Sequence, residues 1–266
     1  MKPNRSQNAY AKYAKADAQY INKDTISSFC NTNERLIPEG TPITGLVLEF
    51  PGLDGNSCLG GTMEMQDCYE NGFTSECAKN GIIVAYLFPG PWSWMNQGAV
   101  RMSDLVVDAI MEKYGISNRN DFKIVAAGGS MGGLGSLLFA IDSKHGVDAC
   151  VAHCPCCNTV DCFHSGKEMP RTFISAICAY DMPFSEALKT ISPEHRIPDM
   201  PDIPYLIYGD EVDELFPIDD TIRFVEKMKQ ANLNVRYKTL ENQPHGGCGA
   251  EDRVLMDSFI FNIILK

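Results

Sequence analysis

FKIVAAGGSMGG, at residues 122–133, is the stretch that decides the fold of this chain. Residues 122–127 form an apolar run typical of a buried parallel strand, and residues 134–141 continue at helical spacing. Between them lies the turn Gly128-Gly129-Ser130-Met131-Gly132. A serine in such a turn takes a strained backbone conformation that exposes its hydroxyl, and a Cβ at the outer glycines would collide with neighbouring backbone. The stretch therefore predicts a strand, a sharp turn and a helix whose first N–H groups point at the serine.

Further apolar runs predict strands that alternate with helices along the chain. We expect strands at residues 43–50, 81–88, 147–152, 203–208 and 235–240, with a short edge strand at 25–31. Helices are expected at residues 64–79, 100–114, 172–179, 185–191, 218–230 and 251–265. This alternation favours a mostly parallel central sheet with helices on both faces. The length of 266 residues suits a single domain of this kind, spanning residues 1–266.

Two segments depart from the alternation. Residues 1–40 are interpreted as an N-terminal extension, whose first part has the composition of a short amphipathic helix. Residues 153–200 carry cysteines, prolines and only weak periodicity between two predicted core strands. We expect this second segment to be a small cap insertion over the site that contains the serine.

The overall composition excludes some partners. A formal net charge of −11 argues against nucleic acid or an anionic membrane, because phosphate groups attract basic surfaces. No apolar run approaches the length of a membrane span, and the N-terminus lacks the apolar core of a secretory signal. Eleven cysteines without such a signal favour free thiols in a reducing cytoplasm. The oligomeric state is left open by the sequence.

Two later loops supply the partners that a nucleophilic serine needs. Serine requires a base within hydrogen-bonding reach, and that base is oriented by a carboxylate. The segment GDEVDELFP, at residues 209–217, contains Asp213 four residues before Pro217. The segment PHGG, at residues 244–247, places His245 on a loop before the last predicted helix. Ser130, Asp213 and His245 therefore follow one another in the order serine, acid, histidine.

These motifs resemble the α/β-hydrolase superfamily, in which G-x-S-x-G is the nucleophile elbow and the three residues occur in this order. The resemblance covers roughly residues 40–266, and it is greatest to catalytic domains of the prolyl oligopeptidase and acetyl-esterase types. It implies an α/β-hydrolase fold in which Ser130 is the nucleophile, His245 the base and Asp213 the acid. It implies no metal and no organic cofactor. Other acids remain open as the orienting carboxylate: Asp210, Glu211, Glu214 and Asp161.

The resemblance also implies two main-chain donors for a developing oxyanion. One is the N–H of Met131, directly after the nucleophile. The other is the N–H of Leu53, in a Pro51-Gly52-Leu53 turn that resembles the H-G-x turn of the superfamily. Here proline stands where histidine is usual, which leaves the loop geometry open.

Both tryptophans of the chain, Trp92 and Trp94, fall in the loop after the strand at 81–88. Ligands bind at the carboxyl edge of open α/β sheets, so these rings are candidates for a substrate-binding wall. The alternative is that they only anchor the loop. A second candidate cluster, HCPCCN with CFH, contributes cysteines and histidines at residues 153–164. Its spacing lacks the paired C-x2-C motifs of zinc sites, so we expect packed thiols, with metal binding or a redox switch as alternatives.

Together these features predict a cytoplasmic serine carboxylesterase. We expect hydrolysis of a small or medium ester, with a short acyl or aryl group and possibly on a carbohydrate, through an acyl-enzyme. A peptidase or amidase of the prolyl oligopeptidase type is the first alternative. A catalytically silent hydrolase fold that binds a ligand or partner is the second.

Overall fold

The centre of the protein is a parallel sheet with one antiparallel edge strand. The computed structural model describes residues 17–55, 58–60, 66–165 and 169–266. In these residues the sheet has seven strands, ordered β1-β3-β2-β4-β5-β6-β7. They are β1 Cys30–Thr32, β2 Gly45–Phe50, β3 Ile82–Leu87, β4 Lys123–Gly129, β5 Ala149–His153, β6 Tyr205–Asp210 and β7 Val235–Leu240. Only the β1–β3 pair is antiparallel, so the carboxyl ends of β2 to β7 meet at one edge.

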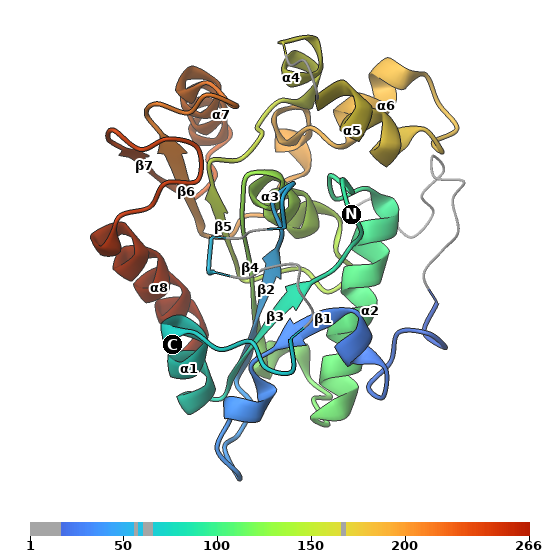
Figure 1. Ribbon diagram of the computed structural model, residues 1–266, viewed down its shortest axis with the longest axis vertical. Coiled ribbons are helices and arrows are strands. Elements are labelled where there is room, and N and C mark those ends of the chain that lie inside the picture. The colour runs from blue at the N-terminus through green and yellow to red at the C-terminus, as the bar shows by residue number, and fades with distance from the viewer. Residues whose placement is uncertain (1–16, 56–57, 61–65, 166–168) are drawn as a thin grey trace.

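Helices cover both faces of the sheet. Successive residues of β2 and β3 pack into two different apolar clusters, one on each face, which explains why these strands read as continuous apolar runs. Helices α2 (Gln97–Lys113), α3 (Met131–Asp142) and α7 (Ile218–Gln230) pack into one cluster. Helices α1 (Gly72–Lys79) and α8 (Ala250–Ile264) pack into the other and lie side by side in Figure 1. The expected α/β architecture is confirmed.

The segment between β5 and β6 lies beyond the carboxyl edge of the sheet (Figure 1). It contains α4 (Thr159–Ser165), α5 (Met169–Ile177), α6 (Phe184–Thr190) and the 3-10 turn η4 (Pro193–Asp199). An ion pair of 2.8 Å joins Arg196 to Asp142 at the end of α3. A second, of 3.1 Å, joins Arg223 of α7 to Glu194. The segment is therefore fixed to helices on one face of the core.

Most predicted elements are present, with shifted ends. The helix at 218–230 and the strand at 235–240 are confirmed to the residue. The prediction of a strand over 25–31 is wrong in part, because a 3-10 turn, η1 (Ile26–Ser28), precedes the short β1. Short 3-10 turns also occur at η2 (Glu34–Leu36) and η3 (Arg119–Asp121). The predicted N-terminal helix falls mainly on residues outside the described part. None of the described helices has the length and apolar character needed to span a membrane.

The start of α1 shows why a helix boundary was missed. The sequence predicts a helix from residue 64, but α1 begins at Gly72. The Asn71 side chain accepts a hydrogen bond from the Thr74 N–H, and the Thr74 hydroxyl accepts one from the Asn71 N–H. This reciprocal cap satisfies free N–H groups and so fixes the first turn.

Candidate active site

The turn between β4 and α3 holds Ser130 in a strained conformation. Its φ of +58° is rare for a residue with a side chain. A Cβ on Gly128 would lie 2.2 Å from the main-chain oxygen of Gly132, and one on Gly132 would lie 2.0 Å from that of Phe50. Only glycine fits at either position. The Ser130 N–H donates to the main-chain oxygen of His153, at 2.9 Å, which ties the turn to the end of β5.

Three side chains from separate loops form a hydrogen-bonded line. His245 Nε2 lies 2.8 Å from Ser130 Oγ, and His245 Nδ1 lies 2.7 Å from Asp213 Oδ2. The other carboxylate oxygen of Asp213 accepts the N–H groups of Leu215 and Phe216, each at 2.8 Å. An ionised carboxylate can only accept, so Nδ1 carries a proton toward Asp213 and Nε2 is free to accept one from the serine.

The alternative acid Asp210 has a different set of contacts. It is 1 % exposed, and its two oxygens face His153 Nε2 at 2.9 Å and the Gly246 N–H at 2.7 Å. Asp213 is therefore the carboxylate in contact with the His245 ring. The other acids considered from the sequence make separate contacts: Glu211 with the Asn242 N–H, Glu214 with the His245 N–H, and Asp161 with Arg223.

Two main-chain N–H groups lie in the segments expected to stabilise an oxyanion. Met131 is the first residue of α3, and Leu53 lies in the loop after β2. The close approach of Gly132 to the Phe50 oxygen shows that these two segments touch. Within the described ranges, neither the Met131 N–H nor the Leu53 N–H donates to another protein group.

Sequence reasoning missed the residue that fastens the loop after β2. Glu49 is fully buried near the end of that strand. Its carboxylate accepts the Leu59 N–H at 2.8 Å and the Tyr69 hydroxyl at 2.5 Å. The Tyr86 hydroxyl donates to the main-chain oxygen of Gly55 in the same loop. The available signal was a lone acid in an otherwise apolar strand, since a buried carboxylate needs such donors.

The prediction that Trp94 contacts substrate is not supported by its position. Its side chain is fully buried, and its Nε1–H donates to Thr172 Oγ1 of α5 at 3.0 Å. Its ring lies 4.3 Å from that of Phe173, measured between centroids. Trp94 therefore anchors the loop to α5, which was the alternative considered. Trp92 is partly buried and lies under the Arg171 guanidinium, at 5.5 Å from the ring centroid.

The cysteines are all free thiols. Those at positions 156, 157 and 162 pack in the apolar core, and burial raises the pKa of Cys157. Four potential metal donors lie within 4.8 Å of one another, and they are Cys154, Asp210, Asp213 and His245. The four carboxylate oxygens in this group already accept hydrogen bonds from protein groups. Protein hydrogen bonding therefore accounts for the geometry of this set.

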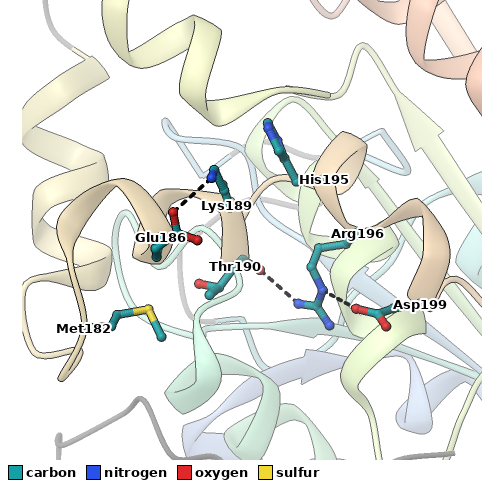
Figure 2. Close-up of a pocket in the computed structure, with 7 residues that line it drawn as sticks. All are labelled: Met182, Glu186, Lys189, Thr190, His195, Arg196 and Asp199. Atoms are coloured by element: carbon teal, nitrogen blue, oxygen red, sulfur yellow. Dashed lines mark hydrogen bonds and ion pairs between the residues drawn. The ribbon is translucent and has the colours of Figure 1, made fainter.

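A separate pocket of about 300 Å³ lies between α6 and η4, and Figure 2 shows its lining. It is lined by Met182, Glu186, Lys189, Thr190, His195, Arg196 and Asp199. Its charges are largely paired within the pocket, Lys189 with Glu186 at 2.9 Å and Arg196 with Asp199 at 2.8 Å. Since it contains none of Ser130, Asp213 or His245, we do not assign the reaction to it.

The sheet topology, the strained serine and its hydrogen-bonded histidine place the protein among serine hydrolases of the α/β-hydrolase fold. The chain belongs to the prolyl oligopeptidase family, whose sequence profile matches residues 94–261. No curated protein sequence matches the chain significantly.

Solved structures share this fold at low sequence identity. Acylaminoacyl peptidase of Pyrococcus horikoshii matches with a TM-score of 0.67 and 14% identity, over 86% of this chain and 39% of that one. Dipeptidyl peptidase 4 of Porphyromonas gingivalis matches with a TM-score of 0.62 and 15% identity, over 84% and 32%. This chain thus spans about a third of that peptidase. A truncated carbohydrate esterase from gut microbiota matches with a TM-score of 0.63 and 13% identity, over 86% and 90%.

Proposed function

We propose that the protein is a serine carboxylesterase that cleaves a small or medium ester, with Ser130, His245 and Asp213 as its catalytic residues. The observation that carries the proposal is the line of two hydrogen bonds, 2.8 Å and 2.7 Å long, from serine through histidine to aspartate. Short acyl or aryl esters, including esters on carbohydrates, are the substrate class.

The reaction follows from the positions of the protons. His245 Nε2 takes the Ser130 proton as Oγ bonds to the ester carbonyl carbon, and Asp213 stabilises the imidazolium. The Met131 and Leu53 N–H groups donate to the oxyanion of the tetrahedral intermediate. His245 then gives the proton to the departing alcohol oxygen, which leaves an acyl-enzyme. His245 then takes a proton from water as the water attacks the acyl carbon, and it returns that proton to Ser130 Oγ as the acyl bond breaks, which releases the acid and restores the serine.

Substitution of Ser130 by alanine tests the proposal. With p-nitrophenyl acetate and butyrate, we expect Ser130→Ala to lower kcat at least about 10³-fold, because the nucleophile is lost. Ser175→Ala, at an exposed position on α5, is the matched control and should keep the full rate. Equal rates for the two variants would remove Ser130 as the nucleophile.

A peptidase or amidase is the second candidate, because the family and two of the solved structures above are named for peptidases. The esterase is placed first because a carbohydrate esterase shares the fold and because ester cleavage asks less of the same serine, histidine and aspartate than amide cleavage does. Hydrolysis of dipeptidyl anilides with no turnover of esters would reverse this preference. If the protein is instead a catalytically silent hydrolase fold that only binds a ligand or partner, the folded protein will not react with a fluorophosphonate.

The surroundings of the protein are also inferred. Eleven free thiols favour a reducing cytoplasm. The net charge of −11 favours a small-molecule substrate over nucleic acid or an anionic membrane.

A further inference from the structure

A second histidine–aspartate pair lies beneath the proposed catalytic residues. His153 ends β5 and Asp210 ends β6, and each is 1 % exposed. His153 Nε2 lies 2.9 Å from Asp210 Oδ1. The rings of His153 and Tyr208 pack edge to face, with their centroids 6.2 Å apart. Two ionisable groups are expensive to bury, so their retention at the site calls for a role. The reaction scheme above uses neither of them.

This pair contacts the main chain at or beside all three proposed catalytic residues. The main-chain oxygen of His153 accepts the Ser130 N–H at 2.9 Å. The main-chain oxygen of Asp210 accepts the Asp213 N–H at 3.3 Å. The free carboxylate oxygen of Asp210 accepts the N–H of Gly246, the neighbour of His245, at 2.7 Å.

Sheet pairing alone does not hold the histidine loop in place. The register between β6 and β7 ends with Asp210 opposite Leu240, well before His245. Gly246 has a φ of +78°, so the direction of its N–H depends on a backbone conformation that glycine adopts freely. The Asp210 carboxylate fixes that N–H, and His153 fixes the carboxylate.

On the basis of the proposed function, we propose that His153 and Asp210 are positioning residues that hold the His245 loop in register with the Ser130 turn. His153 contributes twice, through its main-chain oxygen to the serine turn and through its ring to Asp210. Loss of the ring contact frees the carboxylate and with it the loop. A displacement of the base by about 1 Å lowers a catalysed rate by about 100-fold.

The pair is tested by replacing each member in two ways. His153→Leu and Asp210→Leu remove the contact, whereas His153→Gln retains an amide N–H for Asp210, and Asp210→Asn retains an oxygen for Gly246. We expect the leucine variants to lose about 100-fold in kcat with little change in KM. The glutamine and asparagine variants should recover at least about a tenth of the wild-type kcat. All rates are normalised to the serines that react with a fluorophosphonate.

Rates on esters with different leaving groups distinguish a displaced His245 from a general loss of protein stability. A displaced His245 protonates the alcohol poorly, so the loss should be greater for an ethyl ester than for a p-nitrophenyl ester, whose leaving group needs less help. Asp104→Asn is the control, because Asp104 is a buried aspartate that bonds to Ser143 and Lys144. It should lower the melting temperature with both rates unchanged.

Wild-type kcat on both esters in the leucine variants overturns the positioning role. If those variants do not fold, a loss of about 100-fold in kcat in His153→Gln and Asp210→Asn, with the ratio of ethyl to p-nitrophenyl rates unchanged, overturns it as well. Neither result alters the loss of activity expected for Ser130→Ala, so failure of the pair and failure of the proposed function are distinguishable.

Discussion

Gly132→Ala tests the packing on which the serine turn depends. The added Cβ would lie 2.0 Å from the main-chain oxygen of Phe50, against a practical limit of 3.0 Å. The start of α3 and the end of β2 must therefore separate by about 1 Å. The atoms that the added Cβ would meet belong to the main chain, so no side chain can rotate away to relieve the contact. Overpacking of this kind destabilises by about 1–3 kcal/mol. The gain in helix propensity, about 1 kcal/mol, is too small to offset the upper part of that range.

The same separation moves Met131 away from Leu53, the two proposed oxyanion donors. Misplacement by about 1 Å, or loss of one donor, lowers kcat by about 100-fold. The assay is p-nitrophenyl acetate hydrolysis per folded molecule, with thermal unfolding measured beside it. Gly72→Ala is the matched control, because nothing lies within 4 Å of its added Cβ, and it should keep the rate and gain up to about 1 kcal/mol. Wild-type kcat and melting temperature in Gly132→Ala would contradict the packing inference.

Three further predictions concern stability, pH and thiols. Trp94→Phe removes the hydrogen bond to Thr172 and should lower the free energy of unfolding, measured with urea, by about 1 kcal/mol. Its KM should stay close to the wild-type value, because the side chain anchors the loop and does not touch substrate. Burial alone would raise the pKa of Asp148, but the Ile124 N–H and the Arg119 guanidinium lower it below its ordinary value of 3.8. Asp148→Asn should therefore destabilise the protein at neutral pH, and the difference should shrink as pH falls below about 4, which acid titration of unfolding would reveal. Iodoacetamide at about pH 7.5 should leave hydrolysis intact, because burial raises the pKa of the Cys154 thiol; rapid inactivation would contradict this.

Features set by neighbouring residues could be predicted from the sequence. The strand–turn–helix around Ser130 follows from local apolar spacing and from glycines that admit close backbone approach. Helix α7 was predicted to the residue because its apolar positions are regularly spaced and a proline precedes it.

Features set by distant partners could not be predicted. Asp210 and Asp213 are three residues apart and chemically identical. Asp210 still lies in β6, where its side chain meets His153 from the next strand. Asp213 lies in the following turn, where its contacts with the Leu215 N–H and the His245 ring define its direction. Which carboxylate meets the ring depends on the turn geometry, so Asp213 could be favoured from its place before Pro217 and from the superfamily resemblance, but the sequence left Asp210 open.

The burial of Trp94 also depends on a partner that is distant in the sequence. Its hydrogen-bond partner Thr172 lies 78 residues later in the chain, on α5. The sequence alone predicts that a tryptophan in a loop at the carboxyl edge of a sheet contacts substrate. The structure shows that α5 covers this tryptophan. The partners of Glu49 are likewise 10 and 20 residues away, at Leu59 and Tyr69.

The position of β5 between β4 and β6 has a consequence for how this protein can diversify. The stretch that leaves β5 emerges between the nucleophile and the acid, yet contributes neither. Ser130, Asp213 and His245 are consequently all encoded outside the stretch between β5 and β6. Libraries that vary the exposed positions of residues 169–190 while retaining Thr172 should therefore leave the hydrogen bonds among Ser130, His245 and Asp213 intact.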